Sequence, residues 1–208
     1  YIPPGVPHHG VAEDACMTIS VGLRAPSSAE LLGDFVDTLI CDADEAVRYA
    51  DPDLAPVQDP CEIDAAAMGR AIEALNKLRM HDPERLGDWF GRFITLYRSA
   101  GTPLDPDPPR SRIEVEFDLR QGAVLARHPW TRAAWRRDGA DKRRARLYIG
   151  GQVHALALAD ARTLAGCEQL DADVYAGLGE DARARVLDLL AQGHYHLALP
   201  EAMEDDGA

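Results

Sequence analysis

The stretch YIPPGVPHHGVAEDACMTISVGLRAP, residues 1–26, decides how the rest of the chain is interpreted. Tyr1-Ile2 is typical of a strand end and Pro3-Pro4-Gly5 of a turn, because proline fixes φ and glycine accepts positive φ. In residues 16–23 apolar side chains alternate with small polar ones, which predicts a strand with one apolar and one polar face. Such a strand suits a β-barrel that packs one face outward and holds a polar ligand inside.

Motifs in this stretch and beyond it resemble one enzyme family. YIPPGxPHxG (residues 1–10) followed by SVGxRAP (residues 20–26) is similar to the second half of the JmjC-type cupin of the bacterial ribosomal oxygenases. DPDLAP (residues 51–56) and WFGRFIT (residues 89–95) continue the resemblance in the same order, so it covers most of the chain. Members of this family are iron(II)- and 2-oxoglutarate-dependent dioxygenases that hydroxylate an arginine of a large-subunit ribosomal protein.

The resemblance implies a metal ligand at His8, the histidine that follows YIPPGxP. In the family this histidine is the distal member of a 2-His-1-carboxylate triad, which leaves positions open at a non-haem iron. The neighbouring His9 points elsewhere on an extended chain and is expected at the surface or behind the ligand. Thr18 and Ser20 share one strand face and are expected to bind 2-oxoglutarate, unless they are only small residues in a narrow barrel. For Arg24, a structural salt bridge is favoured over pairing with the co-substrate.

The other two iron ligands of the family form an H-x-D pair upstream of this histidine. None of the seven histidines of this chain is followed two positions later by Asp or Glu, and the first residue is Tyr rather than Met. We therefore expect the chain to be the C-terminal part of an oxygenase, truncated or split. Alone, it is expected to bind iron(II) weakly and to show no 2-oxoglutarate turnover.

The composition narrows the class of protein. Acidic residues outnumber basic ones by 35 to 22, which gives a formal net charge of −13. This excess argues for a soluble protein without a uniform nucleic-acid-binding surface. Four scattered cysteines without C-x-x-C spacing predict reduced core residues rather than disulfides or a zinc site. No apolar run is long enough to cross a bilayer, and the start has no signal-peptide pattern, so the cytoplasm is the expected location.

Residues 27–100 are predicted to form an α-helical region. Its helices begin after capping residues at Ser27, Asp64 and Asp82. The last helix has a broad aromatic face, made of Leu86, Trp89, Phe90, Phe93, Ile94 and Tyr97. Such a face packs within its own chain or against a second copy. The resemblance implies a homodimer, because those oxygenases dimerise through such a segment.

Prolines in residues 101–111 predict a linker, and residues 112–200 then resemble the winged-helix domain of the family. Short strands are expected at 124–125, 147–149, 153–156 and 194–199, with helices at 159–166 and 180–192. Residues 113–119 alternate as a strand would, yet the family has a short helix there, and we predict the helix. The last residues, 201–208, form an acidic tail.

The fold class predicted from these regions is α+β. Residues 1–26 would close a double-stranded β-helix of the JmjC type, residues 27–100 would form the dimerisation region, and the winged helix would follow the linker.

A basic run lies between Arg127 and Arg146. It holds eight of the 22 basic residues and is interleaved with Trp130 and Trp135. Basic residues with aromatic neighbours on a winged-helix module predict contact with RNA. The alternative is a solvated, flexible hairpin.

By resemblance, the predicted reaction is hydroxylation of a ribosomal-protein arginine, with 2-oxoglutarate converted to succinate and CO₂ at iron(II). The acidic charge of the chain would attract such a basic substrate. The competing prediction is a non-catalytic dimerisation or binding module whose winged helix contacts RNA or protein.

Overall fold

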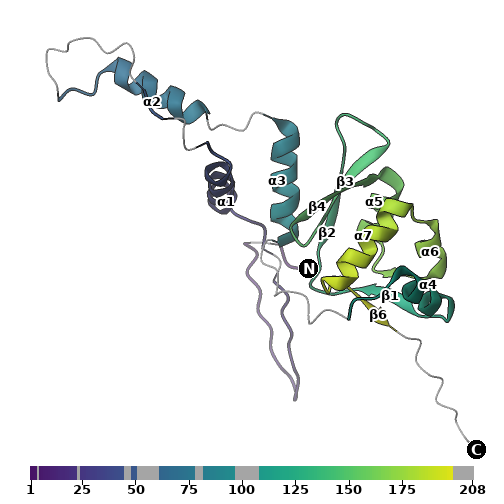
Figure 1. The fold of residues 1–208 in the computed structure, drawn as a ribbon. Coiled ribbons are helices and arrows are strands. Elements are labelled where there is room, and N and C mark those ends of the chain that lie inside the picture. The colour runs from purple at the N-terminus through teal and green to yellow at the C-terminus, as the bar shows by residue number, and fades with distance from the viewer. Residues whose placement is uncertain are drawn as a thin grey trace, which may run out of the picture.

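The computed structural model describes residues 1–3, 5–22, 24–44, 48–50, 61–77, 82–96 and 108–198. Within these residues the helices and strands follow the order α1 (Ser28–Cys41), α2 (Ala65–Lys77), α3 (Pro83–Leu96), α4 (Arg112–Arg120), β1 (Val124–Arg127), β2 (Ala133–Arg137), β3 (Arg144–Ile149), β4 (Gln152–Ala157), α5 (Leu158–Gly166), β5 (Gln169–Leu170), α6 (Ala172–Gly177), α7 (Glu180–Ala191) and β6 (Tyr195–Ala198). Figure 1 shows α4–α7 gathered around the strands, whereas α1 and α2 extend away from them.

The strands form two antiparallel sheets of three strands each, in the orders β5-β1-β6 and β2-β3-β4. In the first sheet, Leu125 of β1 lies opposite both Leu170 of β5 and Leu197 of β6. The chain leaves this sheet after β1, builds the whole second sheet, and returns through β5 and β6. The second sheet is therefore an insertion between the two parts of the first.

The core of this region lies between the helices α4–α7 and the strands. Its fully buried side chains include Val115 of α4, Leu125 of β1, Leu147 of β3, Leu164 of α5 and Leu189 of α7. Burying each such side chain contributes about 1.5–3 kcal/mol. This single cluster joins both sheets to the helices and stabilises the winged-helix region.

Strand β3 has a different neighbour on each face. Ala145, Leu147 and Ile149 belong to the core cluster. Arg146 and Tyr148 instead reach the carboxylate of Asp88 on α3. Alternate residues of a strand point to opposite sides of the sheet, which explains the division. The second sheet is thus covered by the domain core on one face and by α3 on the other, as Figure 1 shows for α3.

Two glycines one helical turn apart allow α3 to approach the sheet closely. A Cβ at Gly87 would lie 2.6 Å from Nε of Arg136, and one at Gly91 would lie 2.6 Å from the ring of Tyr148. Residues four apart lie on the same side of a helix. The glycines therefore mark the surface of α3 that contacts β2 and β3.

Local signals in the sequence predicted the helix starts correctly. Ser27 and Glu30 form the expected reciprocal capping box before α1. Asp64 Oδ1 accepts a 2.7 Å hydrogen bond from the backbone N–H of Ala67 before α2. Asp82 Oδ1 accepts a 2.8 Å hydrogen bond from the N–H of Glu84 at the start of α3. Each cap satisfies a helix N–H group that has no partner within the helix.

The helix predicted at residues 113–119 is also present, as part of α4. A capping box of Ser111 and Glu114 precedes it, although the same residues alternate like a strand. The capping box was the local signal that favours the helix, since it satisfies two backbone donors at once.

The turn between β3 and β4 has glycine at both central positions. Gly150 has φ of 53° and Gly151 has φ of 79°, which side-chain-bearing residues rarely adopt. A Cβ on Gly150 would overlap the ring of His194, and one on Gly151 would overlap the side chain of Leu96. The N–H of Gly151 also donates to Thr95 Oγ1 at 3.0 Å. The predicted hairpin turn is confirmed, and it contacts the end of α3 on one side and His194, the residue before β6, on the other.

Residues 16–22 of the strand predicted at residues 16–23 form no strand in this structure, and Leu23 lies outside the described residues. A strand requires a neighbouring strand to pair with its backbone N–H and C=O groups. None of the six strands described by the structure pairs with this segment, which runs as an extended chain (Figure 1).

Three elements were not predicted: β2, β5 and α6. Arginines dominate the second half of β2, and the other two elements have only two and six residues. Such elements are too short or too polar for hydrophobic periodicity to reveal them. Residues 101–107 of the linker predicted at 101–111, the tail at 201–208 and the motif at 51–56 lie outside the described residues.

The four cysteines form no disulfide, as expected, but most are not core residues. Cys16, Cys41 and Cys61 are exposed and Cys167 is half-buried. The prediction of a core position was wrong because three of them lie in the N-terminal and helical segments, where little is buried. Across the described ranges, no helix combines the length and the apolar character that a membrane span needs.

We predict that Gly91→Ala loosens α3 from the second sheet. The added methyl group would require Tyr148 to move, and overpacking of this kind costs about 1–3 kcal/mol. Urea unfolding followed by tryptophan fluorescence measures the change. Gly69→Ala in α2 is the matched control, because a Cβ there meets nothing within 4 Å and alanine favours a helix by about 0.5–1 kcal/mol. Equal behaviour of the two variants would contradict the close approach.

We also predict that a buried histidine makes stability fall with acid. His154 of β4 is 8% exposed and its Nε2 has no hydrogen-bond partner. Burial, together with the charge of Arg185, lowers its pKa to about 4, with His194 acting in the same direction and Asp188 opposing. Because the unfolded chain takes up a proton near the ordinary histidine pKa and the folded chain does not, stability declines as pH falls from about 6.5 to 4.

The expected loss between pH 7 and pH 5 is about 2 kcal/mol from this group. Denaturant unfolding at both pH values measures it. His154→Gln should remove that part of the pH dependence, whereas His196→Gln, on an exposed residue of β6, should keep it. An unchanged pH slope in His154→Gln would refute the assignment.

Candidate functional site

His8 lies in the exposed, extended segment that precedes α1. Its Nδ1 is 3.4 Å from the backbone oxygen of Val6. A carbonyl oxygen only accepts hydrogen bonds, so Nδ1 carries the proton in this contact and Nε2 presents its lone pair. This is the arrangement in which a neutral imidazole binds a metal ion.

The other predicted site residues lie in the same extended segment. His9, Thr18 and Ser20 are all exposed. Within the described ranges, no hydrogen bond or ion pair joins Thr18 or Ser20 to His8. Over the same residues, no group of three His, Cys, Asp or Glu side chains is close enough to hold a metal ion. The assignments of His8, Thr18 and Ser20 therefore stay predictions.

Part of the aromatic face predicted on α3 packs within the chain, and the rest of it is exposed. Trp89 lies 4.9 Å from the ring of Phe35 on α1 and 5.7 Å from that of Phe93. Its Nε1 donates a 2.7 Å hydrogen bond to Asp34 on α1. Arg85 of α3 also pairs with Asp42 at 2.8 Å. These contacts hold α1 beside α3.

Many other apolar residues of the three helices are exposed. None of the residues of α1 or α2 is buried. The exposed apolar side chains are Leu32, Val36 and Ile40 on α1, Met68, Ile72 and Leu75 on α2, and Leu86, Phe90, Ile94 and Leu96 on α3. We call this set the apolar surface of α1–α3. An exposed apolar surface of this kind marks an interaction site.

A groove of about 450 Å³ runs between α1 and α3. Asp34 and Thr38 line it from α1 and Trp89 and Phe93 from α3, and Gly151 also lines it. It combines an apolar wall with polar groups, and it adjoins the apolar surface of α1–α3.

Two arginines of the basic run pair with α3. Arg136 binds Glu84 through two hydrogen bonds, at 3.0 and 2.7 Å, and Arg146 lies 3.0 Å from Asp88. The hydroxyl of Tyr148 donates to Asp88 at 2.7 Å. The bond with Arg136 holds the pKa of Glu84 below its ordinary value, and burial raises the pKa of Tyr148. This network fixes the charged side chains of the sheet to the helix.

Other members of the basic run are also engaged within the chain. Arg127 donates to the backbone oxygens of Leu164 and Ala165, and Arg144 donates to that of Ala155. Much of the basic run lies in strands β2 and β3 of the second sheet. This part of the run is therefore not the flexible hairpin that was the alternative prediction. Contact with RNA through Arg127–Arg146 stays a prediction, and fewer arginines are free for it than the sequence suggested.

The helix in the position of a recognition helix is acidic on its outer side. α6 and α7 are joined by a short turn that contains Gly179, as in a helix-turn-helix, where the second helix enters the DNA groove. The exposed charged residues of α7 are Glu180, Asp181 and Asp188. Glu180 pairs with Arg112, and Asp188 pairs with Arg185 at 2.6 Å. These pairs leave no excess of positive charge on the outer side of α7, so this helix lacks the charge that attracts phosphates.

Reasoning from the sequence missed the partners of the basic run. Glu84 and Asp88 are four residues apart on α3, on the side that also carries Gly87 and Gly91. Carboxylates spaced by one helical turn beside glycines were the available signal, because that spacing places them on one face.

Comparisons with known proteins relate both ends of the chain to the same group of enzymes. Residues 1–31 match the family described as JmjC domain, and residues 77–196 match the family described as ROXA-like winged helix. Ribosomal protein uL16 3-hydroxylase of Escherichia coli (strain K12) is 37% identical over 127 residues, which cover 61% of this chain and 34% of that protein. A probable ribosomal oxygenase of Haemophilus influenzae is 41% identical over 54 residues, which cover 26% of this chain and 13% of that protein.

Solved structures give the same relationship. The crystal structure of E. coli YcfD has a TM-score of 0.66 and 26% identity, and the match covers 84% of this chain and 45% of that one. YcfD described as a ribosomal oxygenase in complex with cobalt and 2-oxoglutarate has a TM-score of 0.63 and 27% identity, with 84% and 47% covered. The chain thus spans about a third or less of these two curated relatives and under half of these structures.

Proposed function

Because the chain belongs to the JmjC family of ribosomal oxygenases and carries their ROXA-like winged helix, we propose that the protein hydroxylates a ribosomal protein with 2-oxoglutarate as co-substrate. The observation that carries the proposal is the order of two family matches on one chain. A JmjC segment at residues 1–31 is followed by the winged helix at residues 77–196.

The names of the relatives indicate the chemistry of the proposed reaction. One relative is a 3-hydroxylase of ribosomal protein uL16, and YcfD was crystallised with cobalt and 2-oxoglutarate. Cobalt(II) and iron(II) are neighbouring divalent metals that accept the same nitrogen and oxygen ligands. We propose iron(II) as the metal here, an arginine of a large-subunit ribosomal protein as the residue modified, and the cytoplasm as the location.

The described residues do not by themselves fit an iron site. They place the predicted ligand His8 in an exposed segment, and no group of three possible metal ligands gathers among them. A facial triad needs two histidines and a carboxylate. We therefore assign His8 as one ligand and infer no reaction step through the metal from this structure.

Thr18 and Ser20 are the residues that we propose for the co-substrate. Their hydroxyls donate hydrogen bonds of the kind that a carboxylate accepts. Both would have to lie on the inner face of the barrel, which requires pairing of residues 16–22 with neighbouring strands.

We predict that His8→Ala abolishes hydroxylation, whereas His9→Ala retains most of it. The test uses the natural gene product that contains this chain, with iron(II), 2-oxoglutarate and ribosomal protein uL16 of the same organism. Mass spectrometry detects the added oxygen atom on an arginine peptide, and NMR detects succinate. Thr18→Val should raise the KM for 2-oxoglutarate while the gene product still binds the ribosomal protein.

Three outcomes would count against this proposal. Absence of turnover by the natural gene product would favour a non-catalytic binding module. Unchanged turnover in His8→Ala would overturn its assignment as a ligand, and modification of a residue other than arginine would overturn the substrate assignment.

We further propose that the apolar surface of α1–α3 binds a second copy of the chain. Ten apolar side chains on three consecutive helices are exposed, which is far more than the isolated exposed apolar residues of a typical monomer. Opposing copies of α2 would each cover a stripe that has no partner within the described residues. An interface built this way would repeat the same contacts twice about a two-fold axis.

Size-exclusion chromatography with light scattering tests this proposal. The chain should elute with twice its monomer mass, and both Ile72→Glu on α2 and Phe90→Glu on α3 should shift it to the monomer, because a charge would be buried without a partner. Ile113→Glu is the matched control, since Ile113 is 76% exposed on α4, outside this surface. A monomeric wild-type chain, or a dimer unaffected by both variants, would rule out the interface.

A further inference from the structure

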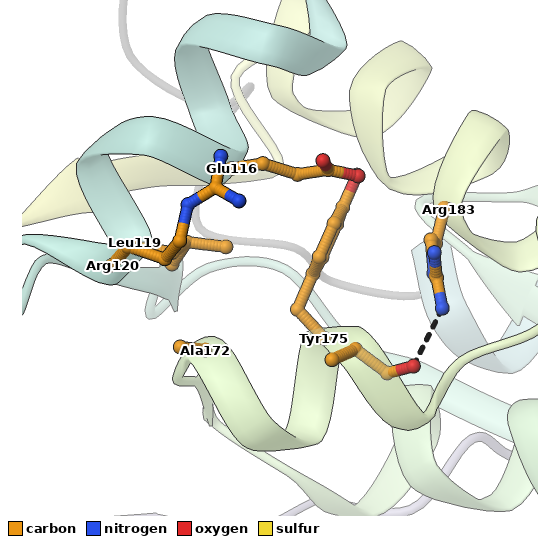
Figure 2. Close-up of a pocket in the computed structure, with 7 residues that line it drawn as sticks. Glu116, Leu119, Arg120, Ala172, Tyr175 and Arg183 are labelled. Carbon is orange, nitrogen blue, oxygen red and sulfur yellow. Dashed lines mark hydrogen bonds between the residues drawn. The ribbon is translucent and has the colours of Figure 1, made fainter.

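A pocket of about 170 Å³ lies between α4, α6 and α7 in the winged-helix region. Figure 2 shows Tyr175 rising from α6 in its centre, with Glu116 and Arg120 on the α4 side and Arg183 on the α7 side. The floor is apolar and consists of Leu119, Ala172 and Ala176. None of the features used for the proposed oxygenase function lies in this pocket.

Two donors of the pocket are buried without a partner. Tyr175 is 2% exposed, and its hydroxyl makes no hydrogen bond. Nε of Arg183 is also buried and unbonded, although another nitrogen of its guanidinium donates to the backbone oxygen of Ala176 at 2.5 Å (Figure 2). A buried polar atom without a partner costs about 1–3 kcal/mol. Such donors are expected where a bound molecule supplies the acceptor.

The charge of the pocket favours an anion. Glu116 is its acidic member, and Arg112 already binds that carboxylate, with Nε 2.7 Å from Oε1, and lowers its pKa. Neither Arg120 nor Arg183 pairs with a carboxylate among the described residues. Arg112 also binds Glu180. The three guanidinium groups of this cluster, those of Arg112, Arg120 and Arg183, therefore outnumber its two carboxylates by one. The pocket keeps a net positive charge in a chain whose formal net charge is −13.

From this arrangement we infer that the pocket binds a small carboxylate with a short aliphatic stem. The planar guanidinium of Arg183 and the phenol of Tyr175 suit the two oxygens of a carboxylate, with Arg120 at the entrance. The apolar floor accepts a few methylene groups, which a phosphate ion lacks. The volume limits the bound group to about the size of one amino-acid side chain.

Titration of the full chain with butyrate at constant ionic strength tests the inference, with NMR signals of the arginine side chains as the readout. Butyrate should shift the Nε–H signals of Arg183 and Arg120 and leave that of Arg143 in place, because Arg143 is 91% exposed on another surface. Butyramide, the neutral analogue, and inorganic phosphate should each bind at least about tenfold more weakly, since one lacks the charge and the other the stem. Equal effects of butyrate and butyramide, or of butyrate and phosphate, would overturn the inference.

Variants separate a binding role from a structural one. Arg183→Gln and Arg120→Gln should each weaken butyrate binding about tenfold or more, and Tyr175→Phe about threefold to tenfold. Arg143→Gln should have no effect. Arg120 is exposed, so its variant keeps the test valid if another variant fails to fold.

The stability of the chain without butyrate distinguishes a binding role of Tyr175 from a structural one. Because the Tyr175 hydroxyl has no partner, Tyr175→Phe should leave the free chain as stable as the wild type or more stable. A loss of stability in Tyr175→Phe, or unchanged butyrate affinity in all three pocket variants, would show that the residues serve the fold alone. These outcomes are independent of hydroxylation.

Discussion

The contact of α3 with the second sheet is the interaction on which the arrangement of this chain depends. Two glycines bring the helix against the sheet, and Glu84 and Asp88 then bind Arg136, Arg146 and Tyr148. The apolar part of the contact has no direction, whereas the two hydrogen bonds between Arg136 and Glu84 fix both the angle and the register of the helix. Because α1 is attached through Trp89, the placement of the N-terminal segments relative to the winged helix also relies on α3.

All the described helices except the six-residue α6 could be predicted from the sequence, because their signals are local. Capping residues at Ser27, Asp64 and Asp82 lie within three positions of the groups they satisfy, so no knowledge of tertiary structure is needed. The same holds for the glycine turn at residues 150–151. By contrast, β5 depends on a distant partner, because it pairs with β1. The segment at residues 16–22 shows the reverse case. Its alternating pattern is typical of a strand, but a pattern cannot supply the neighbouring strand.

The candidate sites also differ in whether their residues are close together or far apart in the sequence. His8 was found through a contiguous motif, and the family matches at both ends of the chain agree with that motif. The pocket around Tyr175 draws its residues from α4, α6 and α7, which are separated by up to 67 positions from Glu116 to Arg183. No spacing rule in the sequence joins residues so far apart. The roles of the basic run were equally hidden, because the carboxylates that bind it precede it by about 50 positions.

The glycine pair at residues 150–151 has a consequence for how this sequence can change over time. Positive φ already disfavours other residues at both positions, and on each side a neighbouring side chain occupies the space of a Cβ, His194 for one and Leu96 for the other. A substitution at either position would need a simultaneous change in the backbone and in a residue of another element. Few substitutions at this turn would therefore be tolerated. Among related sequences, these two glycines should change more slowly than the exposed residues of the helices around them.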